Sequence, residues 1–273
     1  MKSLHQVLTF ARQHRQAIPA FNIDSFEIYQ AVEAVVKDIG KPCIVQLSSG
    51  EDKFIQAERL FILVQKARID GLPIYLNMDH GKDPDRLLHL VQLGFDMIHF
   101  DGSDLDFSQN LNQTVTFIDQ AKKLRPNCLI EAEFNKINLV DSQISPDSLT
   151  NPSQAAEFIA KTKADLLAVS VGNLHGVSQK STEIINFDLL SQIKSALPRQ
   201  FLTLHGGSGI SPDQLISAIN LGIVKININT DLRRQFFKSL SSSLSRHSGD
   251  KVYELLTPVI TDLIKVIKSK FYV

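Results

Sequence analysis

The sequence predicts a single α/β barrel of eight parallel strands, and three observations carry this prediction. Short, almost continuously apolar runs alternate with amphipathic segments along the chain, as expected for strands that are covered on both faces. Eight such alternations fit into roughly 230 residues, which is the repeat of a (β/α)8, or TIM, barrel. The length of 273 residues suits one barrel, so we expect one domain over residues 1–273.

The predicted strands are the eight short apolar runs, namely Ile18–Ile23, Cys43–Leu47, Pro73–Met78, Met97–Phe100, Leu129–Glu133, Leu166–Val171, Phe201–Leu204 and Val224–Ile228. A doubly wound open sheet is the alternative fold. It is less consistent with the sequence because no Gly-x-Gly-x-x-Gly follows the first strand.

Helix starts lie between the strands. Asp24-Ser25, Asp83-Pro84, Asn151-Pro152 and Ser211-Pro212 each combine a capping side chain with the beginning of an amphipathic segment, three of them with proline at the first helical position. The tail, Val252–Phe271, predicts one additional C-terminal helix over about 252–271. The longest irregular stretch, 135–150, follows the fifth strand, where a barrel loop usually covers the site.

Composition argues against several classes of partner. The 29 basic and 29 acidic residues cancel, so nucleic acid or a membrane surface has no electrostatic support as a partner. No apolar run approaches the ~20 residues that span a bilayer, and the start reads as an amphipathic stretch rather than a signal peptide. Cys43 and Cys128 are expected to be small buried residues in a reducing compartment. The cytoplasm is the expected location.

Polar residues follow nearly every predicted strand, at the barrel end where reactive groups gather. In chain order these are Asn22, Ser48, Asp79-His80, Asp101, Glu133, His175, His205 and Asn227-Ile228-Asn229-Thr230. If the strands form one barrel, the imidazoles of His80, His175 and His205 converge at one mouth. Three imidazoles with an open fourth position make a catalytic zinc site.

Other ionisable groups leave alternatives open. His99 lies within the fourth strand and is a reserve ligand if it faces the barrel interior. Asp101 and Glu133 either orient the histidines, form a second metal position, or are buried carboxylates bonded to backbone amides.

Two loops have the composition of a phosphate site. Gly206-Gly207-Ser208-Gly209 follows the seventh strand, and Asn229-Thr230 follows the eighth. Barrel phosphate sites commonly use these two loops, whose backbone N–H groups and helix N-terminus face the anion. Lys180 either adds a cation or is a solvated loop lysine.

Taken in order, these residues resemble the motifs of the class II, zinc-dependent ketose-bisphosphate aldolases, which include the fructose- and tagatose-bisphosphate enzymes. The similar segments are Asn77–Gly81, Phe100–Ser103, Glu131–Glu133, Gly172–Gly176, Leu204–Gly209 and Lys225–Thr230, with Ala20–Asn22 and Gln46–Ser48 matching the first two strand ends. The resemblance runs from about residue 20 to 235 and covers most of the chain.

The resemblance implies a zinc-dependent, reversible aldol cleavage of a ketose (bis)phosphate to dihydroxyacetone phosphate and an aldehyde. His80, His175 and His205 would hold one zinc ion, Asp101 and Glu133 would line an alternative buried metal position, and Asp79 would be the acid/base. The dihydroxyacetone phosphate moiety would be held by Gly176, Lys180, Gly206, Gly207, Ser208, Asn229 and Thr230. Asn227 would contact the carbon skeleton, and Asn22 and Ser48 would reach the aldehyde half.

The chain departs from the family pattern in two places. Where the family carries an acidic loop with the proton-abstracting base, this chain reads Phe134 to Asp141, and Asp141 is the nearest replacement. Where the family carries the Asp-Pro-Arg that binds a distal phosphate, it reads Asp250-Lys251-Val252, leaving Lys251, Arg233 or Arg234 as substitutes. We therefore expect an aldehyde partner other than glyceraldehyde 3-phosphate.

Three other functions remain open from the sequence. A Schiff-base aldolase would need a desolvated lysine, for which Lys225 is the obvious candidate, although we interpret it as structural. A barrel metallohydrolase would need a His-x-His at the first strand, where the chain has Phe21-Asn22-Ile23. An inactive sugar-phosphate-binding relative is the third. Family membership implies a homodimer or homotetramer, and it leaves open whether a monovalent cation assists.

Overall fold

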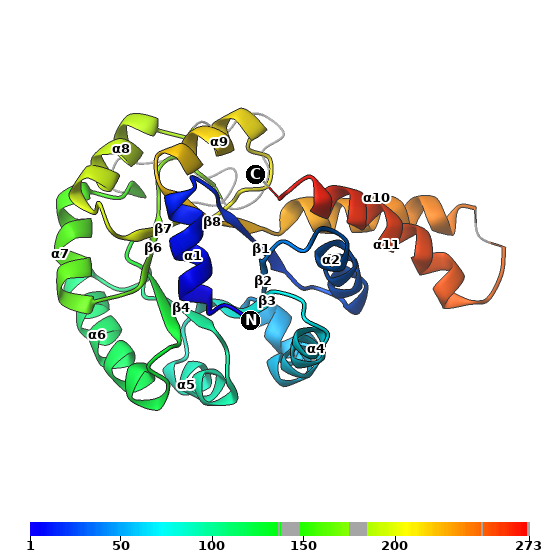
Figure 1. Cartoon of the computed structure of the whole chain (residues 1–273), viewed down its shortest axis with the longest axis horizontal. Helices are drawn as coiled ribbons and strands as arrows, with labels where there is room; N and C mark the ends of the chain where they lie inside the picture. Colours follow the sequence, from blue (N-terminus) through cyan, green and yellow to red (C-terminus); the bar gives the residue numbers. More distant parts are fainter. Residues whose placement is uncertain (136, 138–147, 175–184, 247, 272–273) are drawn as a thin grey trace.

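The computed structural model describes residues 1–135, 137, 148–174, 185–246 and 248–271. Its eight parallel strands close into a barrel in chain order, with β1 paired to both β2 and β8 (Figure 1). The strands are β1 (Ile18–Asn22), β2 (Cys43–Leu47), β3 (Ile74–Gly81), β4 (Met97–Asp101), β5 (Leu129–Glu133), β6 (Leu166–Val169), β7 (Phe201–Leu204) and β8 (Ile223–Ile228). The predicted (β/α)8 barrel is confirmed.

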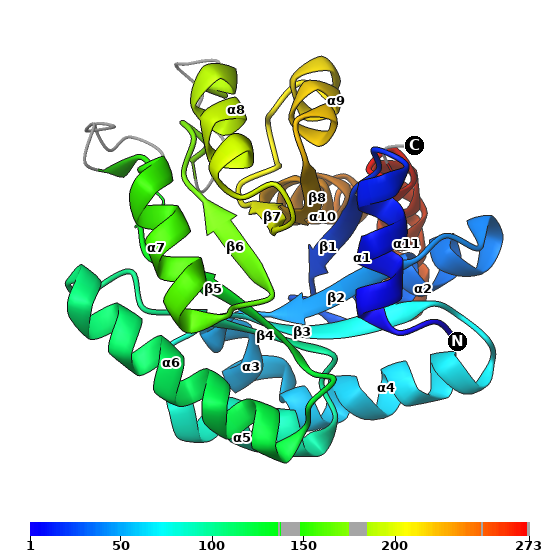
Figure 2. The same ribbon diagram turned by 60° about the vertical axis from the view of Figure 1, so that its left-hand side comes forward.

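Helices surround the barrel and follow the strands (Figure 2). They are α1 (Leu4–Gln13), α2 (Phe26–Ile39), α3 (Ser49–Ile55), α4 (Ala57–Ile69), α5 (Pro84–Leu93), α6 (Phe107–Leu124), α7 (Pro152–Thr162), α8 (Phe187–Ala196), α9 (Pro212–Asn220), α10 (Thr230–Leu244) and α11 (Val252–Lys268). The additional C-terminal helix is α11, which packs against α10 and α2. Figure 1 shows α10 and α11 projecting together from one side of the barrel.

The predicted helix starts have the expected capping geometry. The side chain of Ser25 accepts a hydrogen bond from the Ile28 N–H at the start of α2. Asp83, Asn151 and Ser211 cap α5, α7 and α9 in the same way, each before a proline in the first turn. These caps satisfy backbone N–H groups that have no partner within the helix.

Helix α1 closes the N-terminal end of the barrel. Its apolar face, formed by Leu4, Val7, Leu8 and Ala11, packs on one layer of inward-facing strand residues. That layer contains Ile18, Ala20, Ile44, Tyr75, Met97, Leu129, Leu166, Phe201 and Val224. Since this end is filled by apolar side chains, polar chemistry inside the barrel is confined to the middle and the C-terminal end.

Above this apolar layer the barrel interior is polar. Alternate residues of a strand point to the same face, so the next inward positions after the apolar layer carry a second, buried set. These are Gln46, Asn77, His99, Glu131, Thr203 and Lys225, each fully buried. The next inward-facing residues, toward the C-terminal end of the barrel, include the carboxylates and the imidazole at the strand ends.

Two irregularities change which side chains face inward. In β3 the pairing with β4 moves from Met78↔Ile98 to Gly81↔Phe100, so β3 contains one extra residue, and His80 has φ 50°. In β8 the pairing with β7 moves from Ile223 to Lys225 between successive residues of β7. Such bulges redirect side chains, and they explain how Asp79 and His80, although consecutive, both reach the interior.

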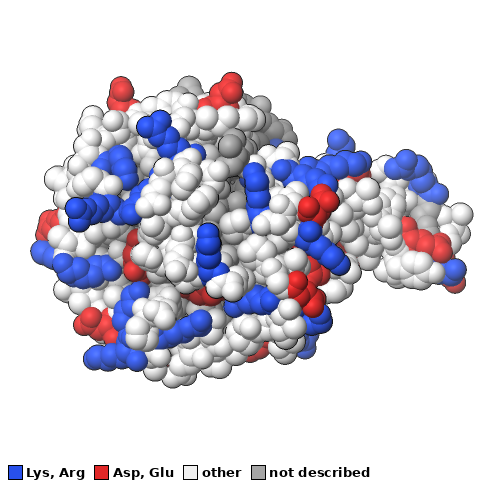
Figure 3. Space-filling view, in the orientation of Figure 1, with Lys and Arg blue, Asp and Glu red and all other residues white. Residues whose placement is uncertain are grey.

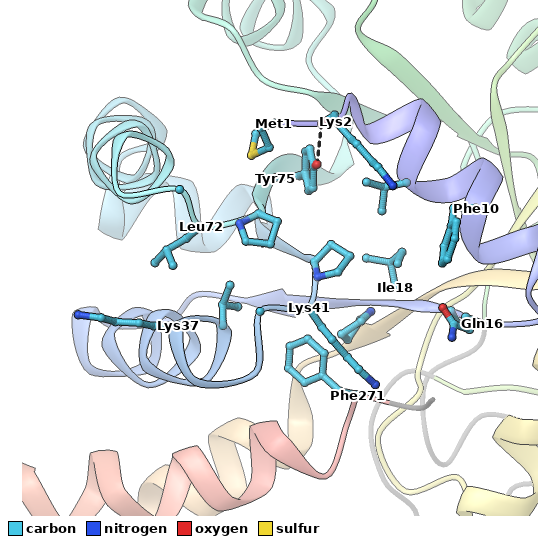
Figure 4. Close-up of a pocket in the computed structure, with 18 residues that line it drawn as sticks. Met1, Lys2, Phe10, Gln16, Ile18, Lys37, Lys41, Leu72, Tyr75 and Phe271 are labelled. Carbon is cyan, nitrogen blue, oxygen red and sulfur yellow. Dashed lines mark hydrogen bonds between the residues drawn. The ribbon is translucent and has the colours of Figure 1, made fainter.

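A cavity of about 610 Å³ lies at the N-terminal end of the barrel, away from these polar strand ends. Figure 4 shows it bounded by Met1, Lys2, Ile18, Tyr75 and other residues, with the Tyr75 hydroxyl donating to the Lys2 carbonyl. No carboxylate or imidazole is among the described residues that line it. It therefore lacks the groups for metal binding or carboxylate-based proton transfer.

Charged side chains of both signs are spread over the surface of the barrel. On the face in Figure 3, lysine and arginine side chains lie as separate groups among uncharged residues and some acidic ones. Within the described residues, no helix has the length and apolar character needed to cross a membrane. Both cysteines, Cys43 and Cys128, are buried and free, as predicted.

Candidate active site

Two imidazoles meet at the centre of the C-terminal end of the barrel. Nε2 of His80, from β3, lies 2.9 Å from Nδ1 of His205, which directly follows β7. The rings are nearly perpendicular, with centroids 4.6 Å apart. Although 125 positions separate the two residues in the chain, the barrel brings their nitrogen atoms together, as expected for two of the three predicted ligands.

Each imidazole is oriented by a carboxylate on its outer nitrogen. Nδ1 of His80 lies 2.8 Å from Asp101 Oδ2, and Nε2 of His205 lies 2.9 Å from Glu131 Oε1. The pKa values of Asp101 and Glu131 both fall below the usual range, since neighbouring cationic and hydrogen-bonding groups outweigh the effect of burial. An ionised carboxylate only accepts hydrogen bonds, so the outer N–H of each ring points to its carboxylate and the inner nitrogens of the two rings face each other. Despite burial, Asp79 and Asp101 raise the pKa of His80, so without a metal ion its inner N–H donates to His205.

This arrangement fits a divalent metal ion. Carboxylate–histidine pairs fix the tautomer of metal ligands in this way, and two nitrogens of a tetrahedral zinc site lie about 3.3 Å apart at Zn–N distances near 2.0–2.1 Å. Burial lowers the pKa of His205 to about 3, which keeps its imidazole neutral as a ligand must be. A small widening between the rings of His80 and His205 would accommodate the ion.

A buried carboxylate oxygen without a hydrogen-bond partner adds to the fit. Oε2 of Glu133 is 3.7 Å from His99 Nε2, 3.8 Å from His205 Nδ1 and 3.9 Å from His80 Nδ1. Both Glu133 Oε2 and His99 Nε2 have no hydrogen-bond partner among the described residues. Burial, together with the negative charges of Asp101 and Glu131, raises the pKa of Glu133 to about 8. Ligand atoms of His80, Asp101 and Glu133 also lie within 4.8 Å of one another, so the two carboxylates predicted to line a second metal position are close together, and that metal position stays a prediction.

His99 does face the interior and is fully buried. Its Nδ1 accepts a hydrogen bond from the His80 backbone N–H at 3.1 Å, and its ring centroid is 4.7 Å from that of His80. Ligand atoms of Asp79, His80, His99 and His205 all lie within 4.8 Å of one another. His99 therefore supports the backbone at the β3 bulge and lies beside the imidazole pair.

Below His205 lies a buried ion pair. Lys225 Nζ is 3.0 Å from Glu131 Oε2, and the same oxygen accepts a hydrogen bond from Thr203 Oγ1 at 2.8 Å. Glu131 thus has donors on both oxygens, which is the condition under which a buried charge is tolerated. The ammonium of Lys225 is engaged here, in agreement with its interpretation as a structural residue.

Asp79 is held by two amide groups at the wall of the site. Asn227 Nδ2 donates to its Oδ1 at 3.0 Å and Asn22 Nδ2 to its Oδ2 at 3.2 Å. Asn22 is itself oriented by Gln46, whose Nε2 donates to Asn22 Oδ1 at 2.9 Å. Despite burial, the pKa of Asp79 lies well below its usual range because of the nearby imidazoles and Lys225. Its carboxylate is ionised and its orientation is fixed.

The predicted phosphate loops lie at the same end. Gly206 has φ +66°, and a Cβ there would lie 1.9 Å from the Leu174 carbonyl oxygen, so only glycine fits. The Gly207 N–H donates to the Asn227 carbonyl at 2.9 Å, and Ser208 Oγ accepts from the Asp231 N–H at 3.1 Å. The Gly-Gly loop is thereby fixed against β8 and the first turn of α10.

These groups line one cavity of about 240 Å³. Its walls are formed by Asn22, Ser48, Asp79, His80, Gly206, Ser208, Asn227, Asn229, Thr230 and Arg233. The side-chain oxygens Oδ1 of Asn227 and Oδ1 of Asn229 are buried acceptors that receive no hydrogen bond from the described residues. The cavity thus combines the imidazole pair, an oriented carboxylate and the loop before α10.

Of two further residues at this wall, one was not predicted from the sequence and the other was one of several candidates. Glu51, in the first turn of α3, was not singled out, although its carboxylate binds Asn22, Ser48, Asn229 and Arg233. Of the three proposed substitutes for the missing arginine, Arg233 lines the cavity. Lys251 lies at the start of α11, 3.3 Å from Glu254.

Several predicted residues lie outside the described part of the chain. These are His175, Gly176, Lys180 and Asp141, together with most of the irregular stretch after β5. Their assignments therefore stay predictions.

Comparisons with known proteins agree with this geometry. The family model for "Fructose-bisphosphate aldolase class-II" matches residues 2–273. A fructose-bisphosphate aldolase of Mycoplasma pneumoniae is 34% identical over 245 residues, covering 87% of this chain and 83% of the relative. One from Streptococcus pyogenes is 29% identical over 265 residues, covering 92% and 89%.

A solved structure has the same fold over nearly its whole length. The crystal structure of the YdjI aldolase from Escherichia coli K12 superimposes with a TM-score of 0.85 at 27% identity, covering 98% of this chain and 95% of that one. Together with the match of the family model over residues 2–273, this shows that the chain belongs to the class II fructose-bisphosphate aldolase family, whose members are aldehyde-lyases.

Proposed function

We propose that the chain cleaves a ketose phosphate reversibly to dihydroxyacetone phosphate and an aldehyde, using a zinc ion held by His80, His175 and His205. The observation that carries this proposal is the pair of inner imidazole nitrogens of His80 and His205, 2.9 Å apart. Family membership makes the chain an enzyme of this reaction class. That the ion is zinc and that His175 is the third ligand are both parts of this proposal.

A divalent ion at this position supplies a Lewis acid for the carbonyl and adjacent hydroxyl oxygens of the substrate, where negative charge develops on cleavage. The chain's own groups prepare that position. Asp101 and Glu131 hold the two imidazoles in one tautomer, and Lys225 neutralises Glu131. A histidine that ligates a metal is neutral, so an ion held by His80 and His205 would keep its full positive charge.

Asp79 is the acid/base for the hydroxyl of the aldehyde half. Its carboxylate is ionised and held by Asn22 and Asn227, so it can accept the hydroxyl proton as the carbon–carbon bond breaks. Asn227 Oδ1, an acceptor without a described partner, is available for a hydroxyl of the carbon skeleton. The base at the dihydroxyacetone half is assigned to Asp141 as a prediction.

The phosphate of the dihydroxyacetone half is proposed to lie against Gly206, Gly207 and Ser208 and the N-terminus of α10. Asn229 and Thr230 contribute that helix start, and Gly176 and Lys180 complete the site in the prediction. Helix α10 has 15 residues, and its N-cap residue Asn229 makes no side-chain capping hydrogen bond. Ser208 Oγ accepts from the Asp231 N–H, and the dipole of the helix favours an anion at this end.

The proposal also covers the domain organisation, the assembly, the location and the partners of the protein. It comprises one domain over residues 1–273, assembly as a homodimer or homotetramer, a cytoplasmic location, and no nucleic-acid or membrane partner. The two free, buried cysteines are compatible with a reducing compartment.

Release of dihydroxyacetone phosphate from ketose phosphates, with and without a chelator, tests the reaction. We expect release that stops on chelation and returns with zinc. Hydrolytic release of inorganic phosphate would support a metallohydrolase instead. Substrate binding with neither product would support an inactive sugar-phosphate-binding protein.

A further inference from the structure

The carboxylate of Glu51 lies beside the cavity, where several hydrogen-bond donors converge on it. Glu51 is only 5% exposed, and its oxygens accept four hydrogen bonds. The donors are Ser48 N at 2.6 Å, Asn22 Nδ2 at 2.9 Å, a terminal nitrogen of Arg233 at 2.7 Å, and Asn229 Nδ2 at 3.2 Å. They come from the ends of β1 and β2 and from the start of α10.

Two of these donors, Asn22 and Ser48, are groups that would otherwise bind the far end of the substrate. Asn22, Ser48, Asn229 and Arg233 all line the cavity, and the sequence assigns Asn22 and Ser48 to the aldehyde half. A carboxylate and a phosphate accept hydrogen bonds from the same kinds of donor. Since Glu51 already occupies them, a distal phosphate would have to compete with a covalently tethered anion.

The charge balance at this wall also opposes a second anion. Arg233 is the one lysine or arginine among the described residues that line the cavity, and it is shared between two carboxylates, Glu51 and Asp24. Burial raises the pKa of Glu51 to about 7, and the neighbouring Asp24 raises it as well. The wall therefore already resists negative charge, and a phosphate dianion would add to the repulsion.

We propose that Glu51 takes the place of a distal phosphate, so that the preferred substrate is a ketose 1-phosphate whose aldehyde half ends in an uncharged hydroxyl group. This inference rests on the proposed aldol cleavage. It assigns Glu51 as a specificity-determining residue and leaves the substrate with one phosphate, at the Gly206–Ser208 loop and the N-terminus of α10.

The test compares two substrates that differ only at the far end, fructose 1-phosphate and fructose 1,6-bisphosphate, with the zinc-loaded protein. We expect kcat/KM for the monophosphate to exceed that for the bisphosphate by at least about tenfold, which corresponds to about 1.4 kcal/mol. Glu51→Gln keeps the size of the side chain and removes its charge, so the ratio should shift at least about tenfold toward the bisphosphate.

Asp52→Asn is the matched control, because Asp52 follows Glu51 in α3 but pairs with Arg86 outside the cavity. It should leave the ratio unchanged. A wild-type preference for the bisphosphate overturns the inference without any variant, and so does an unchanged ratio in folded Glu51→Gln. If the wild-type protein releases dihydroxyacetone phosphate from neither ketose, the proposed reaction fails and the assignment of Glu51 fails with it.

Discussion

Asp79 is the residue on which proton transfer to and from the aldehyde half depends. Each oxygen of its carboxylate accepts a hydrogen bond from a side-chain amide. Asp79→Asn removes the charge and places an NH2 group, itself a donor, against one of these amide donors. We expect kcat to fall by about 10²–10⁴-fold, while zinc content stays at the wild-type level. Steady-state cleavage rates and metal analysis measure the two effects.

The control for Asp79 is Asp85→Asn, which changes an exposed carboxylate in the first turn of α5. Its kcat should match the wild type. A kcat of Asp79→Asn within threefold of the wild-type value would contradict the assigned role.

Glu133 makes stability depend on pH. Its pKa rises from 4.5 to about 8 on folding, chiefly through burial, so the folded state holds a proton that the unfolded state has lost. The free energy of unfolding of the metal-free protein therefore receives a contribution that is complete below pH 4.5 and declines as pH rises toward 8. Glu133→Gln should remove this decline.

Urea unfolding of chelator-treated protein at pH 5, 6, 7 and 8 measures the effect. The difference in unfolding free energy between Glu133→Gln and the wild type should increase with pH across this window. A constant difference would show that Glu133 is ionised in both states.

At the same scale, sequence reasoning located most of the site but missed Glu51. Histidines and carboxylates directly after apolar runs are visible in the sequence, because strand ends meet at one barrel mouth. Glu51 lies four residues beyond the end of β2, in a short helix, and has the sequence character of a solvated carboxylate. Its donors Asn22, Asn229 and Arg233 come from distant segments, so only the folded structure reveals their convergence.

At the scale of elements, the loop after β7 is built around one glycine. A Cβ on Gly206 would lie 1.9 Å from the Leu174 carbonyl oxygen, and φ is +66°. Gly206→Ala must therefore move the loop, and we expect weaker binding of dihydroxyacetone phosphate by at least about tenfold, which is about 1.4 kcal/mol, together with a lower unfolding temperature. Calorimetric titration and thermal unfolding measure these.

Gly50→Ala serves as the control, because a Cβ there meets no atom within 4 Å. It should bind the ligand as the wild type does. Unchanged binding in Gly206→Ala would show that this loop does not hold the phosphate.

The elements themselves were largely predictable, but their irregularities were not. Eight strands followed from apolar runs, and three of them, β2, β5 and β7, have the predicted bounds. Strand β3 was predicted to end at Met78, whereas it continues through the bulge to Gly81. Hydrophobic pattern reports the regular alternation of a strand, so an inserted residue that turns both Asp79 and His80 inward leaves no comparable signal.

At the scale of the molecule, the barrel separates stability from chemistry. Helix α1 and the apolar layer fill one end, while the opposite end carries buried charges, of which those of Glu131 and Asp101 are tolerated because they have partners. Glu131 has Lys225, Thr203 and His205, and Asp101 has His80. Closure of the barrel brings residues 80 and 205 to one point, which no local segment of the chain could do.

A metal shared by His80 and His205 is tested most directly by a zinc titration of the metal-free protein and of His80→Ala and His205→Ala. We expect one tightly bound ion per wild-type chain and an affinity at least about 100-fold lower in each variant, since each variant loses a ligand that a carboxylate holds in place. Zinc binding by either folded variant as tight as that of the wild type would contradict a metal shared by these two imidazoles.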